Sequence, residues 1–228
     1  MTPQLSDYST LVFDCDGVVL DSNRIKTEAF RIAAQPWGAA AAGALVAHHV
    51  ANGGISRHLK FAHFLDAILP EHAPGAVPGR DGPGLEELLS AYAQSVRAGL
   101  MSCAVAEGLE ALRAATPDAH WLIVSGGDQA ELREIFAARG LDGLFDGGIF
   151  GSPDSKDTIL TREQAGGRIE APALFLGDSR YDHEAASAAG LDFIFVSGWS
   201  EFHGWQEYCA NREIRSIESA SQILNIQE

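Results

Sequence analysis

The spacing of hydrophobic residues changes after the first twenty positions, and the change predicts two kinds of structure. The run Leu11–Phe13 is short, apolar and followed at once by charge and glycine, as in a buried strand. From residue 21 apolar residues recur at helical spacing in the segments 21–35, 38–54, 55–69 and 85–101. Residues 70–84 are dense in proline and glycine and predict an irregular loop.

After this helical block the pattern alternates. Apolar runs at 120–127, 147–153, 173–179 and 192–198 predict strands, and the segments 128–140, 155–167 and 181–190 predict helices. Such alternation is typical of an α/β, Rossmann-like fold with a doubly wound parallel sheet. The first strand must join that sheet, since alone it could bury nothing. We therefore predict a core of residues 1–21 and 100–228, with residues 22–99 inserted as a helical cap domain.

Length and composition fit one such unit. The chain has 228 residues, enough for an α/β domain with an insertion. We find no apolar segment long enough to cross a bilayer and no export signal at the start, so we predict a cytoplasmic protein that does not bind membranes. Cys15, Cys103 and Cys209 lie far apart without a CxxC pair, which favours a reduced compartment over a disulfide framework or a zinc site.

The formal charge of −15 excludes some partners. A protein this acidic repels phosphate backbones, so we expect no nucleic acid partner. A small phosphorylated substrate would be repelled as well, unless positive charge is concentrated where it docks. The chain has only three lysines, Lys26, Lys60 and Lys156, so the place of each one matters.

Polar residues gather after four of the predicted strands. In an open α/β sheet, ligands bind outside the carboxyl ends of the strands. The candidates found there are, in chain order, Asp14, Asp16, Ser125, Gly126, Lys156, Asp178 and Asp182. A hydroxyl, a lysine and several carboxylates are therefore expected at one edge of the sheet.

These residues stand in four motifs, "DCDGV", "VSGG", "GSPDSK" and "GDSRYD". In this order the motifs resemble those of the haloacid dehalogenase superfamily of phosphohydrolases. The helical block lies where that superfamily carries its first-type cap domain, as in the phosphoglycolate phosphatase and β-phosphoglucomutase-like branch. The resemblance covers essentially the whole chain.

The resemblance implies a role for each acidic residue. Asp14 is the expected nucleophile, which forms an aspartyl-phosphate, and Asp16 the general acid and then base. Asp14, Asp178 and the backbone carbonyl of Asp16 would hold Mg²⁺, which prefers hard oxygen ligands. An acid at position 16 argues for phosphate-ester chemistry, because dehalogenases and phosphonate hydrolases that are otherwise similar lack it.

The remaining motif residues would bind and neutralise the phosphoryl group. Ser125 and the backbone N–H of Gly126 would hold its oxygens, and Lys156 would screen its charge from that of the nucleophile. Asp182 is either a second carboxylate supporting the site or an exposed residue of a first helical turn. Cys15 is expected to point the opposite way, into the core.

The cap should bind the rest of the substrate. "GGISRHLKF" is similar to a cap segment whose arginine contacts a substrate phosphate, so Arg57 is a candidate for binding a second anionic or polyhydroxylated group. The alternative is a surface arginine after a helix cap. Asn23, Lys26 and Lys60 are further candidates. The spacing of the cap histidines favours ordinary helix surface over a metal site; they are His48, His49, His58, His63 and His72.

We predict a Mg²⁺-dependent phosphatase that acts on a small phosphorylated metabolite, a sugar phosphate or a phosphorylated acid. A sugar phosphomutase of the β-phosphoglucomutase type remains an alternative, because it uses the same two aspartates and a similar cap. A non-catalytic binding relative is the third possibility. The aromatic stretch 197–208 either forms a partner surface or packs a terminal helix onto the sheet.

Overall fold

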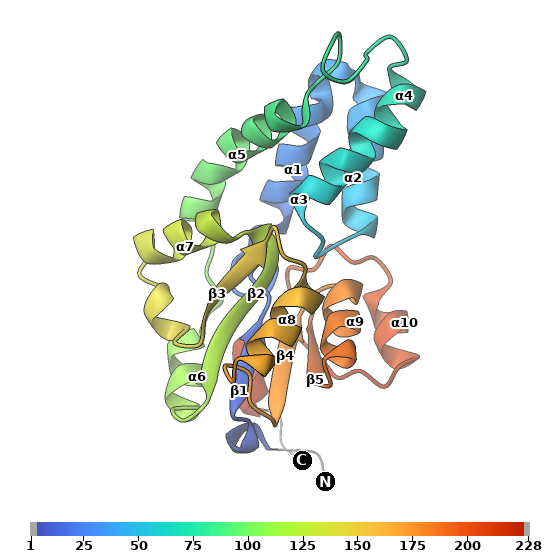
Figure 1. Cartoon of the computed structure of the whole chain (residues 1–228). Coiled ribbons are helices and arrows are strands. Elements are labelled where there is room, and N and C mark those ends of the chain that lie inside the picture. Colours follow the sequence, from blue (N-terminus) through green and yellow to red (C-terminus); the bar gives the residue numbers. More distant parts are fainter. Residues whose placement is uncertain (1–3, 226–228) are drawn as a thin grey trace.

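The protein is built on a six-stranded parallel sheet, which lies in the lower half of Figure 1. The computed structural model describes residues 4–225. The strand order is β3-β2-β1-β4-β5-β6, and every pairing is parallel. The strands are β1 (Thr10–Phe13), β2 (His120–Asp128), β3 (Gly148–Ser152), β4 (Ala173–Gly177), β5 (Asp192–Val196) and β6 (Ser216–Ile217). The first strand of the chain therefore lies inside the sheet, as predicted.

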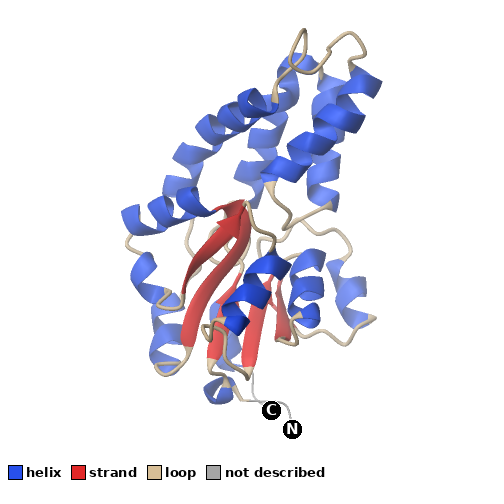
Figure 2. Ribbon diagram, viewed as in Figure 1, coloured by secondary structure: helices blue, strands red, loops and turns tan. Residues whose placement is uncertain are grey.

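Helices cover both faces of the sheet, and Figure 2 shows the two layers. The core helices are α6 (Leu109–Ala115), α7 (Gln129–Ala138), α8 (Lys156–Ala165), α9 (Arg180–Ala188) and α10 (Trp205–Ala210). The predicted α/β, Rossmann-like fold is confirmed. The sequence pattern did not predict α6, α10 or β6, because each is too short to establish a period.

Alternate residues of the central strand explain why both faces are covered. Phe13 packs with Trp121 of β2 in the cluster that α6 and α7 complete. Val12 belongs to the cluster on the other face, with Phe175 of β4 and Ile159 of α8. A strand buried on both sides needs apolar residues at every position, and this is the run that the sequence contains.

Five helices stand beyond the carboxyl ends of the strands, at the top of Figure 1. They are α1 (Asn23–Ala34), α2 (Ala39–Ala51), α3 (Arg57–His63), α4 (Leu69–His72) and α5 (Leu85–Ser102), and we call them the cap helices. A π-helical turn, Phe64–Ile68, joins α3 to α4. The prediction of a loop from residue 70 is wrong for its first residues, because Pro70 lies in the first turn of α4, where it is tolerated.

The two chain segments that connect the cap helices to the sheet run side by side. The N–H of Asp21 donates to the carbonyl oxygen of Ala104 at 3.0 Å, and Leu20 forms an antiparallel bridge with Val105. Helix α5 continues through the predicted boundary between residues 99 and 100. The limits of the cap as a domain therefore stay a prediction.

The aromatic stretch near the C-terminus packs onto the sheet. The ring of Trp205 in α10 stacks on Phe195 of β5, with centroids 5.4 Å apart, and Phe202 joins the same cluster. Of the two interpretations of this stretch, packing therefore holds for these residues. Within residues 4–225, no helix combines the length and the hydrophobicity needed to cross a membrane.

The central core makes a direct prediction about stability. Trp121 is fully buried, and its Nε1 donates to the Thr116 hydroxyl at 3.1 Å. Replacing Trp121 with alanine should lower the free energy of unfolding by about 3–5 kcal/mol, through lost burial and a cavity. Denaturant titration measures the change. Leu59→Ala, at a residue 61% exposed, is the control and should change it by less than about 0.5 kcal/mol.

Candidate active site

Asp14 lies at the carboxyl end of the central strand and is fixed from two sides. Its backbone N–H donates to the carbonyl oxygen of Leu176 in β4 at 2.9 Å. Its side-chain Oδ1 accepts the N–H of Cys15 at 2.8 Å. Cys15 itself is buried in the apolar core, which confirms that it points the other way. The Asp14 carboxylate is thus held in place by the sheet before any ligand binds.

The turn after Asp14 depends on a glycine. Gly17 has a φ of +76°, in the left-handed region, and its N–H donates to the carbonyl oxygen of Leu20 at 2.8 Å. A Cβ at this position would lie 2.2 Å from Oδ2 of Asp178. The "DCDGV" motif therefore needs glycine for two reasons, the turn and the close approach of the second carboxylate.

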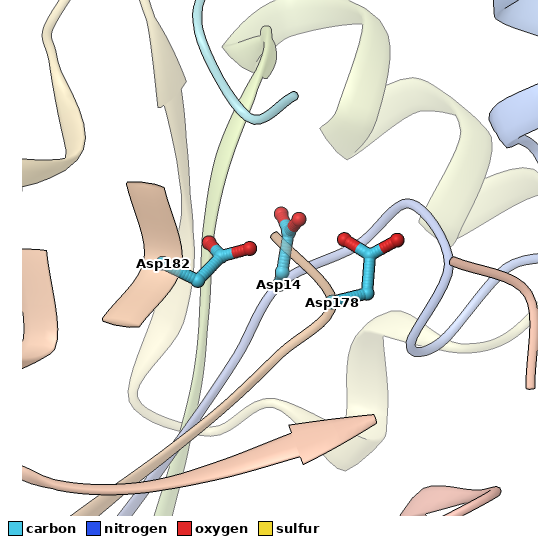
Figure 3. A group of neighbouring side chains, drawn as sticks. All are labelled: Asp14, Asp178 and Asp182. Atoms are coloured by element: carbon cyan, nitrogen blue, oxygen red, sulfur yellow. The ribbon is translucent and has the colours of Figure 1, made fainter. Parts of the chain in front are cut away.

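Three buried carboxylates meet at the ends of β1 and β4, and Figure 3 shows them side by side. Oxygens of Asp14, Asp178 and Asp182 lie within 4.8 Å of one another. Burial, more than any other effect, raises the pKa of Asp14 to about 7 and that of Asp178 well above its usual range, and the neighbouring carboxylates add to both shifts. Such a group of oxygens needs positive charge, and it fits a hard divalent cation.

Lys156 supplies part of that charge. Its Nζ lies 3.0 Å from Oδ1 of Asp14 and also forms an ion pair with Asp182. Oδ2 of Asp182 accepts the Ser179 backbone N–H at 3.0 Å and its hydroxyl at 2.6 Å, at the start of α9. Asp182 is fully buried, so the alternative of an exposed helix residue is wrong. Burial works against the charge of Lys156, yet the two carboxylates raise its pKa above its ordinary value.

Asp16 points toward the cap. Nζ of Lys26, in α1, donates to Asp16 Oδ2 at 2.5 Å, and the Ser22 hydroxyl donates to Oδ1 at 2.6 Å. Burial tends to raise the pKa of Asp16, but Lys26 and Ser22 together lower it. Ser22 was missed as a candidate. Ser22 stands four residues before Lys26, so the two side chains lie on the same side of the first helical turn. This spacing could have identified Ser22 as a partner of Lys26.

A second cap residue orients a carboxylate of the cluster. Nδ2 of Asn23 donates to Oδ2 of Asp178 at 2.7 Å and to the carbonyl oxygen of Trp199 at 2.9 Å. The Ser200 hydroxyl donates to the backbone oxygen of Asp178 at 2.6 Å. Asn23 and Lys26 were candidates for contact with substrate. They bond to Asp178 and Asp16 and also line the cavity, so their contact with substrate stays a prediction.

The "VSGG" motif lies where the cap meets the sheet. Ser125 is fully buried, and its Oγ accepts the Gly127 N–H at 3.0 Å. A Cβ on Gly126 would lie 2.2 Å from the carbonyl oxygen of Gly54, in the loop between α2 and α3. The cap thus rests on the backbone of this motif, which requires glycine for that contact.

Arg57 binds to the core. Its Nη1 donates to Glu131 Oε2 at 2.9 Å, its Nη2 lies 3.7 Å from Oδ2 of Asp128, and its guanidinium stands over the Tyr92 ring. Both acids belong to the start of α7. The predicted contact of Arg57 with a substrate group stays a prediction, since the charge of this arginine is already balanced by Glu131.

A cavity of about 360 Å³ lies between cap and sheet. Asp14, Asp16 and Asp178 line it from the sheet, and Lys60 and His49 line it from the cap. Its volume suits a small metabolite. We predicted that the cap histidines form ordinary helix surface. This is wrong for His49, because its ring lines the cavity. Burial lowers the pKa of His49 to about 2, so the ring is uncharged.

Within residues 4–225, the aspartate cluster is the only group of three or more His, Cys, Asp or Glu side chains close enough to share an ion. The rings of His48 and His63 stack at 3.9 Å. That the cap histidines form no metal site stays a prediction.

The sequence matches the haloacid dehalogenase-like hydrolases over residues 8–190. This match spans most of the chain, which therefore belongs to that family and is a hydrolase. No curated protein gives a significant match to the sequence.

Solved structures share the fold over nearly the full chain. A predicted phosphoglycolate phosphatase from Haemophilus somnus is 18% identical, with a TM-score of 0.73 and coverage of 97% of this chain and 99% of the other. A predicted phosphatase from Clostridium acetobutylicum is 19% identical, with a TM-score of 0.70 and coverage of 96% and 99%. CbbY from Rhodobacter sphaeroides, solved with phosphate, is 17% identical, with a TM-score of 0.65 and coverage of 95% and 96%. At these identities the likeness concerns the fold.

The contact between Gly126 and Gly54 predicts an effect on cap closure. In Gly126→Ala the new methyl group meets a backbone oxygen that cannot rotate away, so the loop 53–55 should be displaced. Amide hydrogen exchange of that loop should become faster by about tenfold or more, because the loop would no longer be held against the core. Gly127→Ala is the control, since its Cβ would meet only the flexible Leu132 side chain, at 3.4 Å. Equal exchange in the two variants would contradict the prediction.

Proposed function

We propose that this hydrolase is a Mg²⁺-dependent phosphatase that hydrolyses a small phosphorylated metabolite through an aspartyl-phosphate at Asp14. The observation that carries the proposal is the place of the Asp14 carboxylate. It is immobilised at the base of a small cavity, beside Lys156, and has a second carboxylate, Asp178, near enough to share a cation. A carboxylate so placed can attack phosphorus without moving the backbone.

Asp14 and Asp178 are the side chains that would hold Mg²⁺, with the backbone carbonyl of Asp16 as the third protein ligand. The all-oxygen donor set suits Mg²⁺, and Asn23 fixes the orientation of Asp178. When bound, the ion supplies positive charge that offsets the repulsion between the nucleophile and the phosphate. The already strong repulsion among the buried carboxylates supports a cation at this point.

The remaining steps use residues of this chain. Asp14 attacks phosphorus while Lys156, Ser125 and the N–H of Gly126 bind the phosphoryl oxygens. Asp16 donates a proton to the leaving oxygen, then takes one from the water that hydrolyses the aspartyl-phosphate, which restores Asp14. Proton transfer of this kind contributes roughly 10²–10⁴-fold to the rate. Lys26 and Ser22 orient the Asp16 carboxylate.

The cavity limits what the enzyme accepts. Its volume suits a small metabolite, and the net charge of −15 repels nucleic acid. The phosphate bound to CbbY and the name of the Haemophilus somnus relative support a small phosphorylated substrate. We propose a sugar phosphate or a phosphorylated acid as the substrate class.

Phosphate release tests the proposal. Wild-type protein with Mg²⁺ should release phosphate from an aryl phosphate and from members of a panel of sugar and acid phosphates, and a chelator should abolish release. Asp14→Asn keeps the shape of the side chain but loses the nucleophilic oxygen, so its release should fall to the background of buffer. Circular dichroism of the variant checks that it is folded.

Three results would contradict the proposal. Isomerised sugar phosphate without phosphate release indicates the mutase. Bound Mg²⁺ with neither reaction on any compound indicates a binding protein. Release that persists in Asp14→Asn excludes Asp14 as the nucleophile.

The close approach at Gly17 predicts an effect on metal binding. A methyl group there would displace the Asp178 carboxylate, so Gly17→Ala should weaken Mg²⁺ binding by about 10–100-fold, measured by calorimetry. Gly79→Ala is a matched control. Gly79 has a φ of +73°, close to that of Gly17, but its Cβ would contact nothing within 4 Å. If both variants bind Mg²⁺ like the wild type, Asp178 is not a ligand.

A further inference from the structure

The three lysines of the chain, Lys26, Lys60 and Lys156, are all buried at the catalytic site. Lys156 forms ion pairs with Asp14 and Asp182, as described above, and Lys26 with Asp16. Lys60 differs, since within residues 4–225 its ammonium has no carboxylate partner. One buried positive charge at the cavity is therefore left without a counter-charge.

The contacts of Lys60 leave part of its ammonium free. The side chain rises from α3, is 2% exposed and lines the cavity. Its Nζ donates to Nδ1 of His49 at 2.7 Å and stands 5.5 Å from the centre of the Phe30 ring. An ammonium has three hydrogens to donate, and neutral His49 takes one of them. Burial, together with Lys26, lowers the pKa of Lys60 to about 7, as expected for a charge that lacks a partner.

Such a lysine is costly for the fold. An ammonium removed from water without a carboxylate costs several kcal/mol, whereas an apolar side chain would pack against Phe30 at no such cost. A ligand that brings a negative charge into the cavity would remove this penalty. A role of Lys60 in binding a ligand therefore explains this cost better than a role in stabilising the fold.

The neighbouring arginine is not equivalent. Arg57, three residues earlier in α3, has its charge balanced by Glu131 and Asp128 of the core. An anion that reached the Nη atoms of Arg57 would have to compete with Glu131 and Asp128 for them. Lys60 offers its charge with no such competition.

From this arrangement we infer that Lys60 determines specificity by binding a carboxylate on the part of the substrate that is not transferred. The inference rests on the proposed phosphatase function and narrows its substrate to a phosphorylated acid. A carboxylate carries one negative charge, which one ammonium balances, whereas a second phosphate dianion would need two. The phosphoryl group faces Asp14, and the carboxylate faces the cap.

Matched pairs of substrates isolate the carboxylate. Three pairs differ only in a carboxylate against a hydroxymethyl group: phosphoglycolate and 2-hydroxyethyl phosphate, 3-phosphoglycerate and glycerol 3-phosphate, and 4-phosphoerythronate and erythritol 4-phosphate. The wild type should prefer the acid by about tenfold or more in kcat/KM in at least one pair, as for a hydrogen bond between charged groups. Equal rates within all three pairs would overturn the inference without any variant.

Variants of Lys60 and Arg57, the two cations of α3, show which residue causes the preference for the acid. Lys60→Met keeps much of the volume and removes the charge, so the acid should lose at least about tenfold more in kcat/KM than its alcohol partner. Lys60→Arg should retain part of the preference. Arg57→Met is the matched control and should lower both members of a pair alike. The inference fails if Lys60→Met affects acid and alcohol equally, or if the preference disappears only in Arg57→Met.

Binding without turnover separates this inference from the proposed function. In Asp14→Asn, calorimetry should show the acid of the preferred pair binding more tightly than its alcohol, and Lys60→Met added to that variant should remove the difference. If this holds while wild-type protein hydrolyses no phosphate ester, the phosphatase proposal fails and the role of Lys60 stands. If hydrolysis proceeds but the acid binds no more tightly, the role of Lys60 fails and the phosphatase proposal stands.

Discussion

The electrostatic repulsion among buried carboxylates is the constraint on which the other features of this site depend. Asp14, Asp178 and Asp182 lie where two central strands end, and each would be unfavourable there alone. Lys156 offsets part of their charge, and a divalent cation would offset more. Because Gly17 has no Cβ, the Asp178 carboxylate can lie close to the turn that follows Asp14.

The cap completes this balance from the other side. Asn23 and Lys26, in its first helix, bond to the carboxylates of Asp178 and Asp16. Arg57 pairs with Glu131 of the core, and the loop containing Gly54 rests on Gly126. The cap therefore orients the carboxylates of Asp178 and Asp16 as well as covering the cavity. In this family member, the residues that shape the cavity and those that orient the carboxylates lie on the same helices.

Much of the fold followed from periodicity, and much of the site from motif order. The apolar run before Asp14 and the alternation after residue 120 correctly predicted a parallel sheet, because strands buried on both faces and amphipathic helices leave different patterns. The place of each motif after a strand predicted that its residues would meet at one edge, and Asp14, Lys156 and Asp182 do meet there. Short elements such as α6 and β6 left no period to detect.

The sequence by itself determined which polar residues gather and at which edge of the sheet they lie, since strand ends and residue types are local properties. Only the tertiary structure decided which positive charges of the cap are paired with carboxylates. Arg57 and Lys60 are neighbours on one helix, and nothing local distinguishes them. Their difference arises because Glu131, 74 positions from Arg57, reaches that arginine, while no described carboxylate reaches Lys60. Pairing across such separations depends on how the chain packs, which local sequence patterns do not encode.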